Sequence, residues 1–177
     1  MAVAYKSLLG RFFGIDLSTG DLVGKDGVPV VRSPDNNITN VTASTLTVTR
    51  DLHDGKTITL NRAAGIAVTL PAATGTGAIY TFFVGTTVTS NTTTIKVADA
   101  TDTMSGIVLV NGDTAANAAE AFGTAATDDT ITLNGSTTGG LKGDWFILQD
   151  VASDLYSVRG AISATGTEAT PFSATVS

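Results

Sequence analysis

The chain has 177 residues, a net charge of −6 and no cysteine, and is long enough to bury its own core as one domain with an extension. Its ten Lys and Arg residues are scattered singly, which excludes the clustered basic surface that phosphate binding needs, so we expect no nucleic acid partner. The lack of cysteine excludes disulfides, thiolate chemistry and cysteine-ligated zinc.

The first segment, MAVAYKSLLGRFFGIDL, does not have the apolar core of a secretory signal, because Lys6, Gly10 and Arg11 interrupt it. No apolar run approaches the ~18 residues that a membrane-spanning helix requires. We therefore expect synthesis in a host cytoplasm and no membrane partner.

Residues 1–36 carry apolar side chains without a sustained period, interrupted by glycines. Two interpretations remain open: a strand or coil packed on its own domain, or an extended arm that anchors on a neighbouring subunit. Adjacent exposed aromatics would be an aggregation liability unless a partner covers them. In the arm hypothesis the contact residues are Leu8, Leu9, Arg11, Phe12, Phe13 and Ile15.

Residues 37–177 predict a mainly β domain, because β-branched residues alternate with polar ones while helix-favouring charged residues are sparse. Runs that recur about every ten residues are typical of an antiparallel β-sandwich or a jelly-roll-like fold. The runs are residues 45–50, 56–60, 66–70, 78–84, 94–97, 107–110, 130–134, 145–149, 155–162 and 174–176.

Local signals predict how some of these runs connect. Asp54-Gly55 predicts a hairpin turn between the first two runs, and Val151–Asp154 predicts another between residues 145–149 and 155–162. The segment Thr114–Phe122 (TAANAAEAF) predicts one short helix, with Asp113 or Thr114 as its N-cap and Gly123 beyond its end.

The pentapeptide TITLN occurs twice, at residues 57–61 and 130–134. It is either a convergence in a threonine-rich chain or the mark of corresponding strands in the two halves of a sandwich.

No motif for catalysis stands out, and we expect no enzymatic activity. His53 lies between Asp51 and Asp54, but we expect these side chains to be solvated in a turn. A polysaccharide depolymerase would need paired carboxylates in a cleft, and the two glutamates, Glu120 and Glu168, stand in poor contexts for that role.

Aspartates gather in expected turns, where they could bind Ca²⁺ or serve as ordinary turn residues. Their spacing matches no calcium motif, so turn chemistry is the better explanation. Two glycine-rich loops, residues 75–77 and 135–140, lack the ending of a phosphate-binding loop. We expect neither a metal nor a cofactor.

Aromatic residues concentrate in the expected strands, where they form either a core or a sugar-stacking platform. We assign Tyr80, Phe82, Trp145, Phe146 and Tyr156 to the core or to contacts within a trimer.

Four stretches resemble small β-rich structural proteins of tailed-phage virions, namely head decoration (cement) proteins. They are Thr57–Pro71, Asp129–Gly140, Gly143–Gly160 and Gly166–Ser173. The pattern along the chain is a strand, a loop with GG, a strand that begins with GDW, a strand that contains VRG and an end with ATPF. The resemblance covers roughly residues 55–177.

The resemblance implies a protein without enzymatic activity that binds the major capsid protein on the outside of the head. It also implies a homotrimer that bridges neighbouring capsomers and keeps Trp145 buried. The alternative is a tail fibre, spike or adhesin module that binds host glycans, for which we expect an exposed aromatic cluster.

Overall fold

The computed structural model describes residues 13–15, 22–24, 29–31, 37–113 and 119–176. The chain divides into two compact units, Met1–Asn37 and Ile38–Ser177. In the first unit, β1 (Phe13–Ile15), β2 (Leu22–Gly24) and β3 (Pro29–Val31) form a three-stranded antiparallel sheet.

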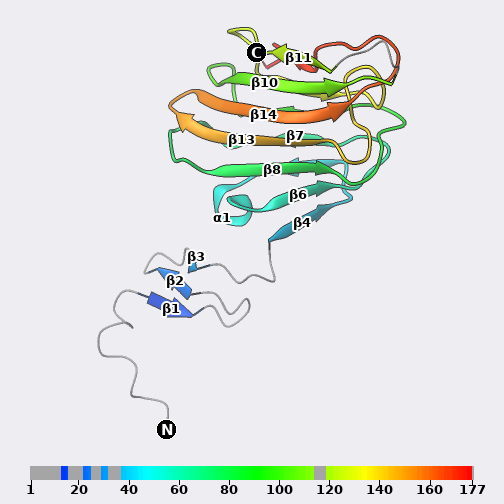
Figure 1. Ribbon diagram of the computed structural model, residues 1–177. Coiled ribbons are helices and arrows are strands. Elements are labelled where there is room, and N and C mark those ends of the chain that lie inside the picture. Colours follow the sequence, from blue (N-terminus) through cyan, green and yellow to red (C-terminus); the bar gives the residue numbers. More distant parts are fainter. Residues whose placement is uncertain (1–12, 16–21, 25–28, 32–36, 114–118, 177) are drawn as a thin grey trace. The chain divides into compact units, whose positions relative to one another are not determined.

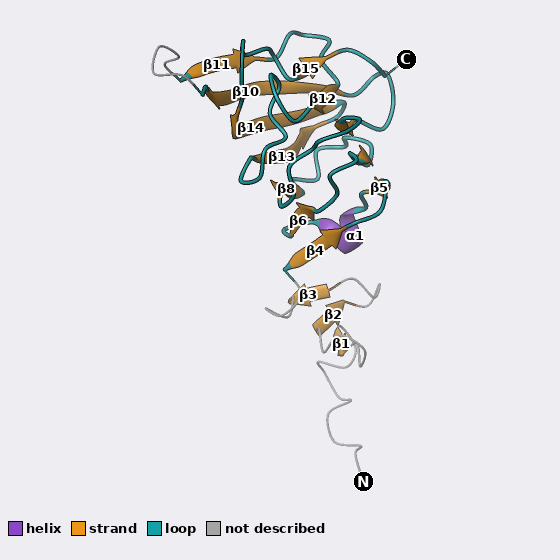
Figure 2. Ribbon diagram, turned by 90° about the vertical axis from the view of Figure 1, so that its right-hand side faces the viewer, coloured by secondary structure: helices purple, strands orange, loops and turns teal. Residues whose placement is uncertain are grey.

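The second unit consists of a seven-stranded and a five-stranded sheet packed together, so the expected mainly β sandwich is confirmed (Figures 1 and 2). The seven-stranded sheet has the order β11 (Glu120–Gly123), β10 (Thr103–Asn111), β14 (Leu155–Ser163), β13 (Trp145–Ala152), β8 (Ile79–Val84), β6 (Thr57–Leu60) and β4 (Ile38–Val41). The five-stranded sheet has the order β15 (Phe172–Ser173), β12 (Thr130–Leu133), β9 (Thr93–Lys96), β7 (Ala67–Thr69) and β5 (Thr45–Thr47).

Strands β4 to β9 alternate between the two sheets, and each of β4 to β7 pairs in parallel with the strand two places later in the chain. In the larger sheet the register aligns Ile38 with Thr57 and Thr57 with Thr81. The sandwich is therefore mixed rather than wholly antiparallel, because this half of the chain winds in stacked turns. The antiparallel pairing that we expected is found where β13 joins β8 and where β12 joins β9.

The core lies between the two sheets. Because successive side chains of a strand point to opposite faces of its sheet, every second residue of a strand faces this core. Its largest buried side chains include Tyr80, Phe82, Phe146 and Tyr156. The Tyr156 hydroxyl donates a hydrogen bond to the Pro71 carbonyl oxygen at 2.8 Å, so this buried polar group has a partner. Burial raises the pKa of Tyr156, which keeps the phenol protonated.

The predicted helix at Thr114–Phe122 is wrong at its C-terminal end. Residues 114–118 lie outside the described residues, but Glu120–Gly123 forms strand β11. This strand pairs antiparallel with β10, and Phe122 packs against the core. Pairing with a long strand thus overrides the helix preference of the alanines, as tertiary contacts commonly do.

The predicted hairpin at Asp54-Gly55 is also wrong, because β5 and β6 belong to different sheets. A short helix, α1 (Arg50–His53), follows β5. The Asp54 carboxylate then accepts a hydrogen bond from the Ile79 backbone N–H at 2.9 Å, and Gly55 N–H donates to the Ile79 carbonyl at 2.8 Å. The turn residues therefore attach the chain to β8 instead of reversing it.

The hairpin predicted at Val151–Asp154 is confirmed, since β13 and β14 pair antiparallel with a register shift near the turn. Asp154 has φ of 60°, the left-handed conformation that Asp tolerates better than most residues. The last described strand, β15 (Phe172–Ser173), lies directly before the predicted run at 174–176.

The two copies of TITLN occupy different sheets. The first begins in β6 of the seven-stranded sheet and the second in β12 of the five-stranded sheet. Strand β6 pairs in parallel on both sides, whereas β12 pairs antiparallel on both sides, so the two copies do not occupy equivalent positions.

Replacing Gly135 with Ala tests the tight loop that follows β12. Gly135 has φ of 80°, and an added Cβ would collide with the Val88 carbonyl oxygen. Gly77 has φ of 76° but has open space around the same position. We expect Gly77→Ala to cost about 1–2 kcal/mol of unfolding free energy from backbone strain alone, and Gly135→Ala to cost about 1–3 kcal/mol more from the collision. Urea unfolding of both variants checks this, and equal losses would contradict it.

Candidate functional site

The outward-facing side of the seven-stranded sheet carries a continuous apolar surface, and Figure 1 views this sheet face on. Register places Leu109, Ala161, Trp145 and Phe83 side by side across β10, β14, β13 and β8. The neighbouring row contains Ile107, Arg159 and Ile147. We call the six apolar residues of these two rows the apolar strip: Phe83, Ile107, Leu109, Trp145, Ile147 and Ala161.

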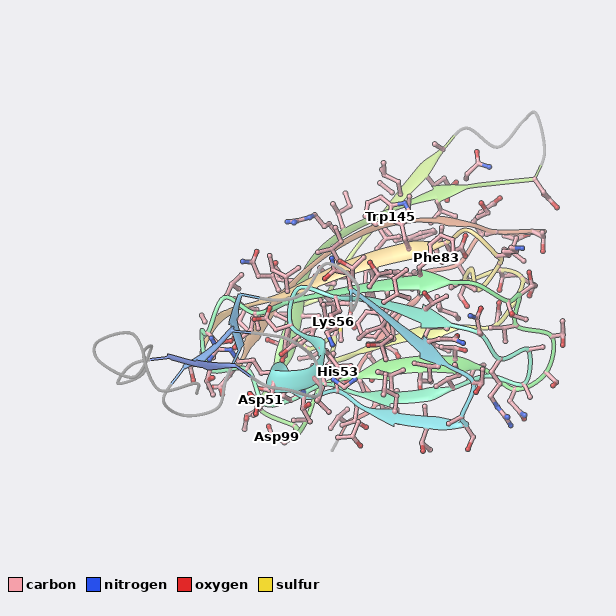
Figure 3. All side chains as sticks on the ribbon, turned by 90° about the horizontal axis from the view of Figure 1, so that it is seen from below. Asp51, His53, Lys56, Phe83, Asp99 and Trp145 are labelled. Atoms are coloured by element: carbon pink, nitrogen blue, oxygen red, sulfur yellow. The ribbon has the colours of Figure 1, made fainter. Side chains whose placement is uncertain are left out.

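Four members of the apolar strip are large side chains with high exposure. Phe83 and Trp145 are each 37% exposed, Ile107 is 51% exposed and Leu109 is 55% exposed. Figure 3 shows Phe83 and Trp145 next to each other. Single exposed apolar residues are ordinary, but contiguous ones usually mark a binding surface.

Arg159 is the one charged side chain among the outward-facing residues that the structure describes on β8, β10, β13 and β14. The chain as a whole has 10 basic and 16 acidic residues, so this face is poor in charge. The outward face of the five-stranded sheet differs, because Thr47, Thr69 and Lys96 align there across β5, β7 and β9. The two faces of the sandwich are therefore chemically distinct.

The aromatic residues assigned to the core or trimer separate into two groups. Tyr80, Phe82, Phe146 and Tyr156 are buried, whereas Trp145 is partly exposed on the sheet surface. Strand alternation explains the difference, because Trp145 precedes the inward-facing Phe146. The same alternation could have identified Phe83, which follows the inward-facing Phe82 and was not among the predicted site residues.

The residues of the proposed arm cannot be placed at a site. Leu8, Leu9, Arg11 and Phe12 lie outside the described residues. Phe13 and Ile15 belong to β1, where they pair with Gly24 and Leu22 of β2. Their role in docking stays a prediction.

His53 is buried, whereas we expected it to be solvated in a turn. The α1 turn directs it inward, and its Nδ1 atom accepts a hydrogen bond from the Thr49 backbone N–H at 3.0 Å. Burial lowers the pKa of His53, which favours the neutral ring that can accept this bond. The histidine therefore stabilises the connection between β5 and β6.

Asp150 does not lie in a turn as expected but inside strand β13, where it is almost fully buried and holds a loop that belongs to another part of the chain. Its carboxylate accepts hydrogen bonds from the backbone N–H groups of Thr74, Gly75 and Thr76, at 3.1, 2.7 and 2.9 Å. The Thr76 hydroxyl donates a fourth, at 2.6 Å. Burial alone raises the pKa of Asp150, but these hydrogen bonds outweigh it and hold the pKa below its ordinary value.

Asp102 and Asp144 have the same kind of role at other loops. Asp144 accepts hydrogen bonds from the backbone N–H groups of Gly140, Leu141 and Ser163, at 2.8 to 3.0 Å. Asp102 accepts one from Ala73, which lies 3.2 and 3.3 Å from its two oxygens. At both residues burial is the largest influence and raises the pKa of the carboxyl.

Among the described residues, no three His, Asp or Glu side chains are arranged to hold a metal ion. Helix α1, with its four residues, does not meet the requirements for a membrane span. Neither the protein-family models nor the curated proteins with which the sequence was compared match the chain. The feature of the described surface that best fits a functional site is therefore the apolar strip.

Replacing Asp150 with Asn should destabilise the fold by about 2–4 kcal/mol near pH 7, because charge-assisted hydrogen bonds are worth about 1.5–3 kcal/mol each and the amide offers only one acceptor oxygen. Since the pKa of Asp150 is lowered in the folded state, its stabilising effect is present above the ordinary carboxyl pKa and is lost as the pH falls through the folded value. The difference between wild type and variant should therefore shrink in acid.

Urea unfolding at several pH values measures this difference. Asp51→Asn, at an exposed position on α1, is the control and should change stability little. The pKa values of Asp102 and Asp144 are raised in the folded state, so these residues add stability to wild type and variant alike as the pH falls. The test therefore uses the difference in unfolding free energy between the two proteins, and not the pH dependence of either protein alone. A difference that stays constant or grows in acid would contradict the role given to Asp150.

Proposed function

We propose that this protein is a structural component of a tailed-phage virion, a decoration or cement protein on the outer surface of the head. In this proposal it binds the major capsid protein, associates as a homotrimer and stiffens the shell. The observation that carries the proposal is the apolar strip, a nearly uncharged and partly aromatic surface on paired strands. Such a surface is suited to burial against another protein.

The buried carboxylates support a structural role over a catalytic one. Asp102, Asp144 and Asp150 all accept hydrogen bonds from backbone N–H groups of loops. A carboxylate whose oxygens are engaged in this way is poorly placed to exchange protons with a substrate. Their chemistry maintains the loops of the sandwich.

The division into two units also suits a decoration protein. The unit Ile38–Ser177 has its own core, and the unit Met1–Asn37 precedes it in the chain. A protein that contacts a shell through two units gains affinity from both contacts together, without either being strong alone. The arm residues predicted from the sequence belong to the first unit.

Binding to heads tests the proposal directly. Purified protein should cosediment with heads from which this chain has been removed, and gold-labelled antibody should mark heads evenly in electron micrographs of intact particles. A chain that lacks residues 1–20 should keep its thermal unfolding transition and lose head binding, and unchanged binding would refute the arm hypothesis. Label confined to the tail, or no binding to heads, would refute a decoration role.

Glycan binding by a tail fibre, spike or adhesin module is a second candidate, and one observation favours it. Trp145 is exposed beside Phe83, whereas a decoration protein was expected to keep Trp145 buried. Exposed aromatic faces on a sheet can stack on sugar rings. The neighbouring Ile107 and Leu109 argue for a protein partner instead, because aliphatic side chains provide neither a flat stacking face nor hydrogen bonds to hydroxyl groups.

A glycan array with the intact protein separates these two functions. If sugars are the ligand, the wild-type protein should be retained on specific glycans. Trp145→Ala should then lose about two- to tenfold in affinity, since an aromatic contact of this kind is worth about 0.5–1.5 kcal/mol. Tyr80 is buried, so a Tyr80 variant would report unfolding and is unsuitable as a control; Leu52→Ala on α1 is suitable. Absence of any retained glycan would leave the decoration role as the better proposal.

A further inference from the structure

We infer that the apolar strip is the docking surface for a different protein, whose own contact surface is apolar and presents a carboxylate to Arg159. The inference rests on the proposed function, within which that protein is the protein of the shell. It goes further by identifying the surface of Ile38–Ser177 that makes the contact and the chemistry of the partner.

The position of Arg159 determines what the partner must offer. Register places it between Ile107 of β10 and Ile147 of β13. A partner that encloses the guanidinium together with these two isoleucines removes its charge from water. A buried charge without a partner is strongly unfavourable, whereas a guanidinium paired with a carboxylate through two hydrogen bonds is compensated. Such a partner therefore binds best when its surface presents a carboxylate at this point.

A second copy of the same surface does not meet this requirement. On β8, β10, β13 and β14, the outward-facing residues that the structure describes include no acidic side chain. Two strips packed face to face would leave both Arg159 side chains without a carboxylate and close to like charge. A twofold contact that packs this face of one copy against the same face of another is thus unfavourable.

The strip also has the residue types of a binding surface and lies on strands that are well held in the sheet. Tryptophan and arginine are the residue types that most often dominate the affinity of protein interfaces, and Trp145 and Arg159 lie on adjacent strands here. Strands β13 and β14 are each paired on both sides, so the backbone that carries these side chains is held before binding. A backbone held in this way loses little conformational entropy when a partner docks.

Two substitutions in this surface test the inference, each with a matched control. Leu109→Asp introduces a charge at a 55% exposed leucine, and Leu52→Asp does the same at a 62% exposed leucine on α1. Arg159→Glu reverses the central charge, and Lys96→Glu makes the same reversal on the other sheet. Because all four positions are at least partly exposed, we expect all four variants to fold, which thermal unfolding followed by circular dichroism verifies.

The measurement is cosedimentation of each full-length variant with heads that lack this chain. We expect Leu109→Asp and Arg159→Glu to weaken binding more than tenfold, as at residues that dominate an interface, and the two controls to bind like wild type. Analytical ultracentrifugation of the free proteins should give the same oligomeric state for all five.

The other outcomes each overturn the inference and are distinguishable. If wild type binds heads and both strip variants bind equally well, the docking surface lies elsewhere while the decoration role stands. If a strip variant alone changes the oligomeric state, the strip is a contact between copies. If wild type itself does not bind heads, the decoration role fails and the inference fails with it.

Discussion

The structure depends on finding hydrogen-bond acceptors for the backbone N–H groups of the loops at the edges of the sandwich. Each time the chain leaves one sheet, it exposes N–H groups that no neighbouring strand can pair, and a buried N–H without a partner is costly. Buried carboxylates solve the problem, with Asp150 holding residues 74–76 and Asp144 holding residues 140 and 141 together with Ser163. An aspartate offers two charged acceptor oxygens for such bonds, whereas an asparagine or a serine offers one neutral acceptor oxygen.

This use of aspartate affects the rest of the surface. Several of the chain's acidic groups are buried at the loops and do not contribute to a charged exterior. The outward sheet faces then carry few charges: threonines lie beside Lys96 on the five-stranded sheet, and apolar side chains surround Arg159 on the seven-stranded sheet. The same composition that indicates a β-rich chain therefore gives two faces of opposite character.

Much of the fold could be predicted from local patterns, because alternation of apolar and polar residues identifies strands such as β6, β8 and β14. Pairing could not be predicted, since Asp54-Gly55 satisfies hairpin chemistry and yet bonds to β8. The pattern of Thr114–Phe122 favours a helix locally, but Glu120–Gly123 pairs with the preceding strand β10, which the local pattern does not show. For the site, the sequence located Trp145, and alternation with the inward-facing Phe146 explains the side of the sheet that it faces. Its neighbour Phe83 could not be predicted, because it belongs to a strand far along the chain.

The apolar strip and Arg159 are best understood together. An exposed face with Phe83, Trp145, Ile107 and Leu109 would invite aggregation if copies could pack against one another through it. The net charge of −6 separates copies at long range, and Arg159 makes face-to-face packing unfavourable at contact, because neither face offers it a carboxylate. One charged residue at the centre of an apolar surface thus penalises the wrong partner and selects a partner with an acidic group, so specificity here comes from repulsion as much as from attraction.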